Sequence, residues 1–246
     1  MTDRIQGAPG PSGGPPAGDS RPAVDLSATD SRGRDGGTGH AGIDPDDALP
    51  APPLGRPPED LTERVVDSEV IHRGHYIEIR RETIERHDGS RAKREIVGHP
   101  GAVAIVALDG EDRVLLVRQW RVAAGRALLE LPAGTLDRDS VTGATEDPDL
   151  AARRELEEET GFRAGQWRKL ASFWTAPGFA TELMHVYLAT DLAPAHEDRL
   201  GPDEDEWLEL ERLPFEHALA AVERGDIADA KSIVGVLWLA RLRERA

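Results

Sequence analysis

The chain is 246 residues long, contains no cysteine and carries a formal net charge of −16 at pH 7. The lack of cysteine excludes disulfides, thiolate zinc sites and cysteine nucleophiles, and it suits a cytoplasmic protein. General nucleic-acid binding depends on clustered Lys and Arg, and a membrane span needs an apolar stretch of about 20 residues. The composition favours neither, so we expect no nucleic acid and no membrane among the partners.

Residues 1–60 hold most of the chain's 18 prolines and no Phe, Tyr or Trp. Such a segment buries too little apolar surface to offset the entropy lost on ordering. We therefore predict a disordered tail over residues 1–60. It does not read as a signal peptide, because no basic start is followed by an apolar run.

Residues 61–98 predict a small antiparallel β-sheet. One strand is expected over residues 69–85 and another over 91–97, on either side of the turn signal His87-Asp88-Gly89-Ser90. Edge strands of so small a sheet invite pairing, so we expect this region to pack against a second subunit in a homodimer.

Residues 99–246 predict an α/β domain with a mixed sheet. A strand that runs into a glycine loop is expected over residues 128–134. Two helices are expected near the end of the sequence, over residues 214–224 and 228–245. The other predicted strands lie at 102–108, 114–120, 167–174, 183–190 and 207–213.

An acidic helix lies between these elements, in Arg154-Glu155-Leu156-Glu157-Glu158-Glu159-Thr160-Gly161-Phe162. Glu155, Glu158 and Glu159 share one helix face, where like charges repel and a hard cation such as Mg²⁺ relieves the repulsion. The opposing interpretation is a solvated acidic helix with i,i+4 ion pairs, Arg153 with Glu157 and Arg154 with Glu158.

Capping signals support a helix at this position. Asp147 or Asp149 suits its start, Pro148 suits its first turn, and Gly161 suits a left-handed end.

Together with Glu146, the segment resembles the Nudix box, whose core reads Glu, seven residues, Arg-Glu-aliphatic-any-Glu-Glu-any-Gly-hydrophobic. One element departs: Gly134 lies twelve residues before Glu146, where the family spacing is six, so the loop within residues 137–145 is longer. The resemblance implies the Nudix fold, an α/β/α sandwich with a mixed sheet.

A second segment resembles the ADP-ribose pyrophosphatase branch of that family. Pro177, in Thr175-Ala176-Pro177-Gly178-Phe179, lies sixteen residues after Gly161, as in that branch. The implied reaction is metal-dependent hydrolysis of the small-molecule nucleotide sugar ADP-ribose to AMP and ribose 5-phosphate. Further likenesses are Arg94-Glu95-Ile96, Gln119-Trp120-Arg121, Leu131-Pro132-Ala133-Gly134, Asp203-Glu204-Asp205-Glu206 and Arg224-Gly225-Asp226-Ile227.

The resemblance also implies metal ligands, which we expect to be exposed. Glu155, Glu159 and the main-chain oxygen of Ala133 would bind Mg²⁺, with Mn²⁺ as a possible substitute. Glu158 would act as an auxiliary ligand, and Arg154 would orient the carboxylates.

The substrate and base assignments come from the same resemblance. Arg121 would face the pyrophosphate, and Arg94 and Glu95 would hold the adenine end from the other subunit. Glu204, in an acidic segment before a strand, is the expected general base, with Glu206 as its alternative. The remaining substrate-side positions are Pro177 and Phe179 in the turn, and His75 or Tyr76 as an aromatic against adenine.

Two other functions remain open. One is a Nudix hydrolase for another nucleoside diphosphate sugar or an oxidised nucleotide. The other is a non-catalytic Nudix-like domain that senses ADP-ribose and regulates a partner. The intact box carboxylates favour an enzyme, and neither His-Glu-x-x-His nor a Gly-rich lysine loop occurs in the chain.

Overall fold

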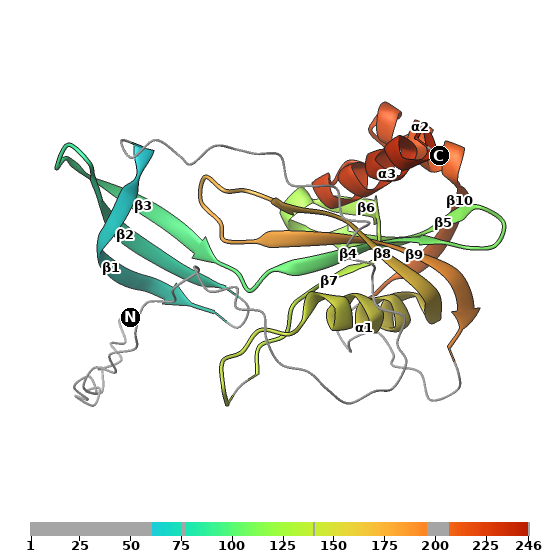
Figure 1. Cartoon of the computed structure of the whole chain (residues 1–246), viewed down its shortest axis with the longest axis horizontal. Coiled ribbons are helices and arrows are strands. Elements are labelled where there is room, and N and C mark those ends of the chain that lie inside the picture. Colours follow the sequence, from blue (N-terminus) through green and yellow to red (C-terminus); the bar gives the residue numbers. More distant parts are fainter. Residues whose placement is uncertain (1–60, 75–76, 140, 196–206, 246) are drawn as a thin grey trace, which may run out of the picture. The chain divides into compact units, whose positions relative to one another are not determined.

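A computed structural model describes residues 61–74, 77–139, 141–195 and 207–245. The first element is a three-stranded antiparallel sheet in the order β1-β2-β3 (Figure 1). Its strands are β1 (Glu63–Arg73), β2 (Glu78–Arg86) and β3 (Arg91–Gly98).

The predicted hairpin turn between β2 and β3 is confirmed, since the Gly89 N–H donates to the Arg86 carbonyl at 2.9 Å. The prediction of one strand over residues 69–85 is wrong. The chain reverses between β1 and β2, where the Gly74 N–H donates to the Ile77 carbonyl at 2.8 Å. The small sheet is therefore a meander of three strands.

The second sheet has seven strands. They are β4 (Ala102–Leu108), β5 (Arg113–Arg121), β6 (Arg126–Glu130), β7 (Ala133–Thr135), β8 (Phe162–Trp174), β9 (Leu183–Pro194) and β10 (Glu209–Pro214). The main order is β10-β5-β4-β9-β8, with β6 paired to β5 and β7 paired to β4. Only β4 and β9 run parallel, so the predicted mixed sheet is confirmed.

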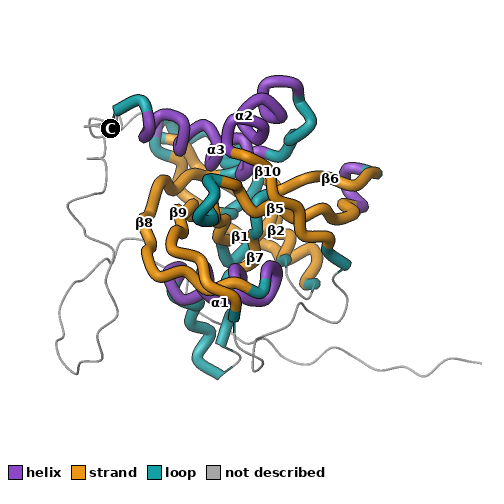
Figure 2. The backbone as a smooth tube through the Cα atoms, turned by 90° about the vertical axis from the view of Figure 1, so that its right-hand side faces the viewer, coloured by secondary structure: helices purple, strands orange, loops and turns teal. Residues whose placement is uncertain are grey.

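Helices cover both faces of the seven-stranded sheet (Figures 1 and 2). They are α1 (Pro148–Thr160) on one face, and α2 (Phe215–Arg224) and α3 (Ala230–Arg243) on the other. Successive side chains of β4 point to opposite faces of the sheet, and helices cover both faces, so all seven residues of β4 are buried. Ile105 packs in the cluster with Leu156 of α1, and Val106 packs in the cluster with Val236 of α3. The α/β/α sandwich expected from the resemblance is confirmed.

The small sheet has little core of its own, since Ile84 is its only buried hydrophobic residue among those described. It joins the turn between β8 and β9 through main-chain bonds. The Val97 N–H donates to the Phe179 carbonyl at 2.7 Å, and the Val97 carbonyl accepts from the Thr181 N–H at 3.0 Å.

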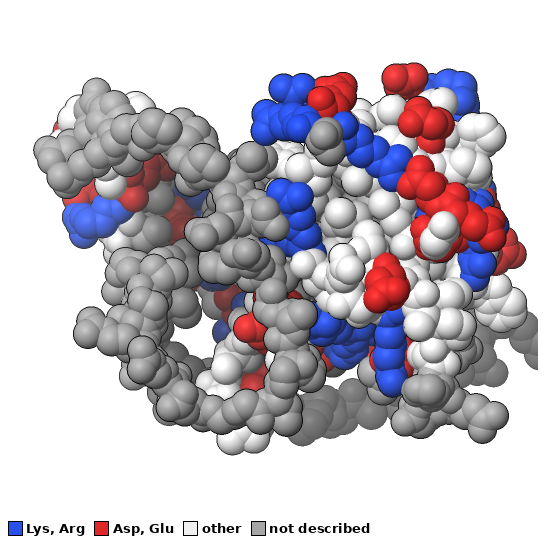
Figure 3. All heavy atoms as spheres, turned by 45° about the vertical axis from the view of Figure 1, so that its right-hand side comes forward, with Lys and Arg blue, Asp and Glu red and all other residues white. Residues whose placement is uncertain are grey.

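Acidic and basic side chains are interspersed on the face of the molecule shown in Figure 3. Within the described ranges, no helix is both long and apolar enough to cross a bilayer.

Candidate active site

Helix α1 begins and ends at the residues that the sequence predicts. The Asp147 carboxylate accepts from the Asp149 N–H at 2.8 Å, and Pro148 is the first helical residue. Gly161 ends the helix with φ 72°, a left-handed conformation that glycine adopts without strain. With Ala151 and Leu156 packed against the sheet, two glutamates of α1, Glu155 and Glu158, line an adjoining cavity.

Arg154 lies at the centre of the box carboxylates. Its guanidinium lies 2.9 Å from a Glu146 oxygen, 2.8 Å from a Glu158 oxygen and 2.8 Å from Glu155 Oε1. Burial alone would lower the pKa of Arg154, but the surrounding carboxylates raise it above the ordinary value. The arginine therefore holds three negative groups together and stays charged. The sequence spacing also allows an ion pair of Arg153 with Glu157. In the structure, Glu157 pairs with Arg163 at 2.6 Å.

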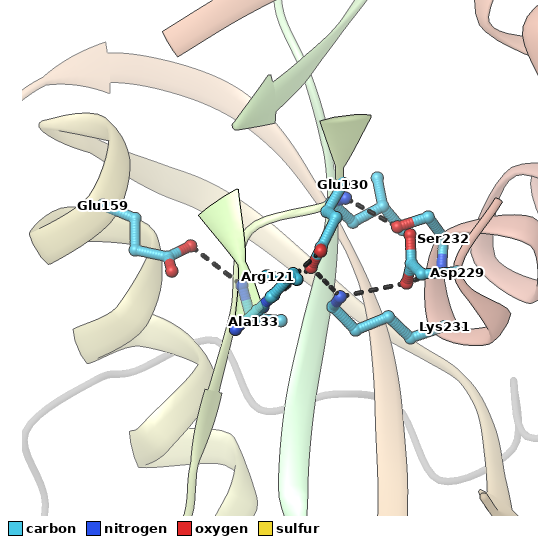
Figure 4. Close-up of polar contacts among 8 residues, drawn as sticks. Arg121, Glu130, Ala133, Glu159, Asp229, Lys231 and Ser232 are labelled. Atoms are coloured by element: carbon cyan, nitrogen blue, oxygen red, sulfur yellow. Dashed lines mark hydrogen bonds and ion pairs between the residues drawn. The ribbon is translucent and has the colours of Figure 1, made fainter. Parts of the chain in front are cut away.

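Strand β7 lies directly against α1. A Cβ atom added at Gly134 would be 1.9 Å from Glu155 Oε1, so only glycine leaves room for this carboxylate. The Ala133 N–H donates to Glu159 Oε2 at 2.9 Å (Figure 4). Glu155 and Glu159 are each 8% exposed. The expectation of exposed ligands is wrong, because they lie against the β7 main chain.

The donor types at this wall suit a hard divalent cation, which prefers carboxylate and carbonyl oxygens. Within the described ranges, however, no three His, Asp or Glu side chains converge tightly enough to hold a metal ion. Oxygens of Glu155 and Glu158 contact Arg154, and Glu159 contacts Ala133. A cation bound here would compete with these contacts for the same oxygens.

A second charged cluster faces the cavity from β5, β6 and α3 (Figure 4). Arg121 donates from Nε to Glu130 Oε1 at 2.9 Å and from Nη2 to Glu130 Oε2 at 2.7 Å. Lys231 donates to Glu130 Oε2 and, at 2.9 Å, to Asp229. The sequence had singled out only Arg121. Glu130 carried a usable signal, since a lone charge within an apolar strand needs a buried partner.

The two clusters line one cavity of about 770 Å³. Its lining also includes three residues that sequence reasoning missed, His99, Thr175 and Glu182. Glu182 accepts from Thr175 Oγ1 at 2.5 Å and lies 3.9 Å from His99 Nε2. Burial lowers the pKa of His99, although the Glu182 charge opposes the shift. Thr175 begins the segment that carried the second family likeness, but no motif in the sequence pointed to His99 or Glu182.

A second hollow of about 730 Å³ lies beside α2. Of its three arginines, Arg118 and Arg224 are paired with Glu211 and Asp226 at 2.5 and 2.8 Å, and Arg126 is the third. None of the predicted site residues lines it. The chemistry therefore points to the cavity between α1 and β5.

The structure does not bring every predicted residue to that cavity. Arg94 is bonded to Glu63 at 2.5 Å, Glu95 is bonded to Arg81 at 3.4 Å, and neither lines it. Pro177, Phe179 and Glu159 do not line it either. Phe179 is 56% exposed, and Glu159 accepts from the Ala133 N–H. The remaining predicted positions, His75, Tyr76, Glu204 and Glu206, lie outside the described residues.

Comparison with known proteins agrees with this geometry. The family model of the NUDIX domain matches residues 98–233, and that of the nucleoside diphosphate sugar hydrolase N-terminal domain matches residues 63–97. An ADP-ribose pyrophosphatase of Bacillus subtilis is 40% identical over 179 residues, which cover 73% of this chain and 93% of that protein.

Another relative, the methanol dehydrogenase activator of Bacillus methanolicus, is 38% identical over 72% of this chain and 92% of its own length. A crystal structure of an ADP compounds hydrolase superposes with a TM-score of 0.63 at 26% identity, over 74% of this chain and 95% of that one. The matched domain model and the long, closely similar relatives give one conclusion: the chain belongs to the Nudix family of hydrolases.

Proposed function

We propose that the protein hydrolyses ADP-ribose to AMP and ribose 5-phosphate with a divalent cation, Mg²⁺ or in its place Mn²⁺. One observation carries the proposal. A single cavity has the box carboxylates Glu155 and Glu158 on one wall and Arg121 with Lys231 on the other. A diphosphate needs both positive side chains and cation ligands, because its own oxygens repel an incoming nucleophile. The relative named ADP-ribose pyrophosphatase supports the choice of substrate.

In the proposed reaction, a water oxygen forms a bond to one phosphorus and the bridging P–O bond breaks. One proton of the water leaves to a base, and the departing phosphate carries away the bridging oxygen. A bound divalent cation would supply neutralisation of the phosphate oxygens and acidify the attacking water. Glu155, Glu159 and the Ala133 carbonyl would hold it, with Glu158 beside them. Nudix enzymes generally depend on such cations.

The other residues divide the remaining work. Arg121 would contact the diphosphate, since its side chain is 41% exposed and lines the cavity. Arg154 would keep the box carboxylates aligned. Glu204, or Glu206 in its place, would accept the proton from the water.

We assign adenine binding to Arg94 and Glu95 of a second subunit, with Pro177 and Phe179 beside the substrate. The proposed enzyme is a cytoplasmic homodimer joined through residues 61–98. Exposed apolar side chains on β1, Val65, Val70 and Ile71, support a covered surface there. Analytical ultracentrifugation tests the dimer, and an active monomer would contradict it.

The substrate is tested by incubating the full chain with Mg²⁺ and ADP-ribose, ADP-glucose, UDP-glucose or GDP-mannose and separating the products. We expect AMP and ribose 5-phosphate to form fastest. If another of these nucleoside diphosphate sugars is cleaved faster than ADP-ribose, that compound is the better substrate and the choice of ADP-ribose is wrong.

A regulatory role is the second candidate, because a 38% identical relative is named an activator of another enzyme. The intact carboxylates at Glu155, Glu158 and Glu159 favour hydrolysis over sensing. Calorimetry would measure ADP-ribose binding, and product analysis would measure turnover at saturating Mg²⁺ or Mn²⁺. Binding without turnover would favour the regulatory role.

A further inference from the structure

Arg121 donates to Glu130 through one edge of its guanidinium. The group has five N–H donors in a rigid fork, and the Nε and Nη2 contacts use two of them. Both hydrogens on Nη1 and one on Nη2 are left for other acceptors. Because the side chain lines the cavity and is 41% exposed, these donors are accessible to a ligand.

Glu130 both orients Arg121 and opposes its charge. It is 1% exposed, and burial alone would raise its pKa, but hydrogen bonding to Arg121 and the charge of Lys231 hold that pKa below the ordinary value. Glu130 is thus ionised at neutral pH. Paired with Arg121 alone, it would cancel the positive charge offered to an anion. The second cation on Glu130, Lys231, adds a positive charge to this trio, and Asp229, 2.9 Å from Lys231, balances it in turn.

Lys231 is itself fixed in place. Its side chain is 12% exposed and contacts Glu130 and Asp229. Asp229 caps α3 by accepting from the Ser232 N–H at 3.2 Å, and the Ser232 hydroxyl accepts from the Leu131 N–H at 2.7 Å. The start of α3 is therefore tied to the residue that follows Glu130, so the ammonium and the carboxylate are held together (Figure 4).

We propose that Lys231 is a positioning residue for diphosphate binding. It fixes Glu130 and, through Glu130, orients the Arg121 guanidinium, and its charge offsets the negative charge that Glu130 places beside Arg121. The inference rests on the proposed function, in which Arg121 contacts the diphosphate. Of the 30 basic residues, all but Lys93, Lys169 and Lys231 are arginines, so lysine is unusual here.

The test measures binding of inorganic pyrophosphate to the full chain by calorimetry, in metal-free buffer that isolates the basic cluster. Lys231→Met should weaken binding about tenfold, the effect of losing one charge-assisted contact. Lys169→Met is the matched control, since Lys169 lies over the Tyr187 ring and does not line the cavity. Unchanged affinity in Lys231→Met would overturn the proposal.

A double-mutant cycle separates positioning from direct contact. In an Arg121→Gln background, Lys231→Met should weaken binding less than about twofold, because the group it positions is gone. Two losses that multiply would mean that Lys231 contacts the anion itself, and positioning would be wrong. Lys231→Arg keeps the charge and should bind within about threefold of the wild type.

Asp229→Asn provides a second variant if Lys231→Met fails to fold. The amide oxygen still caps α3, while the negative charge beside Lys231 disappears. Pyrophosphate should then bind about twofold to threefold more tightly. A purely structural role predicts no gain, so equal or weaker binding would contradict the proposal.

Turnover of ADP-ribose keeps the two proposals apart. Lys231→Met should raise KM about tenfold with kcat nearly unchanged, as expected for a lost binding contact. A wild-type chain that binds pyrophosphate but does not cleave ADP-ribose would sink the proposed function alone. An active wild type with normal KM in Lys231→Met would sink the positioning role alone.

Discussion

The two walls of the cavity are built on the same plan with opposite signs. On the α1 wall, one cation, Arg154, lies among Glu146, Glu155 and Glu158. On the opposite wall, the anion Glu130 lies between Arg121 and Lys231, and Asp229 also contacts Lys231. In both, the central counter-charge holds like charges at positions where they would otherwise repel each other. A charged side chain thus serves as a scaffold for the groups that meet the ligand.

The walls differ in how far apart their residues lie in sequence. The Arg154 contacts to Glu146 and Glu158 span eight and four residues, whereas Glu130 and Lys231 are 101 residues apart. The α1 wall is local and therefore readable as a motif. The opposite wall depends on α3 packing beside β6, and only the folded chain reveals it.

Removing a carboxylate should break the α1 wall most severely. Glu155→Gln and Glu159→Gln should each lower kcat about 10³-fold, because each removes a charge that holds a cation. Glu157→Gln is the control, since Glu157 pairs with Arg163 and does not line the cavity. Steady-state kinetics at saturating Mg²⁺ measures the loss. Near-normal turnover in both variants would remove the box from the mechanism.

Neither wall includes the expected general base. Glu204→Gln should lower kcat about 10² to 10⁴-fold with KM nearly unchanged, as loss of general-base catalysis does. Both constants are measured beside Glu206→Gln. A normal Glu204→Gln with an impaired Glu206→Gln would move the role to Glu206, and two normal variants would leave the base in the box.

Gly134→Ala should sharpen the comparison by moving one carboxylate without removing it. The new methyl would displace the end of the Glu155 side chain, which is flexible, so the fold should persist. We expect kcat to fall about 10²-fold from the misplaced ligand while the melting temperature changes little. Gly110→Ala is the matched control, because nothing lies within 4 Å of a Cβ atom added at Gly110. Equal activities of the two variants would show that the close approach is unimportant.

Glu130→Gln should break the opposite wall through stability. It leaves Arg121 and Lys231 without their shared anion, and we expect a loss of about 2 kcal/mol at pH 7, less than for a fully buried pair because Arg121 is 41% exposed. The folded-state pKa of Glu130 is lowered, so its stabilisation is present above pH 4.5 and declines as pH falls through the folded pKa. Urea unfolding at pH 7 and below pH 4 measures the difference. The difference in unfolding free energy between wild type and variant should shrink in acid. A larger difference below pH 4 than at pH 7 would contradict the prediction.

Most of the fold was predictable because it depends on local pattern. Short-range rules account for the hairpin turn at Gly89 and for the caps of α1 at Asp147 and Gly161. They also account for β4, a continuous apolar run that is buried throughout. The division of residues 69–85 into β1 and β2 was missed, since the chain reverses within one run of strand-forming residues.

The site was predictable only on its helix. The box places Glu155 and Glu159, but burial under β7 needs the position of Gly134 in space. The contact of Lys231 with Glu130 joins residues 101 apart in sequence, and Glu182, seven residues from its partner Thr175, lies in no motif. The catalytic and ligand roles of the individual residues stay predictions until the variants are measured.

The tie between α3 and β6 also sets an order of events during synthesis. Glu130 and Leu131 leave the ribosome about 100 residues before Lys231 and Ser232, their partners in the folded chain. Until α3 has been translated, the Glu130 carboxylate and the Leu131 N–H lack these contacts. Non-local pairings of this kind form late and slow folding. The box helix can therefore form before α3 has emerged, and the Lys231 contact that positions Glu130 forms only afterwards.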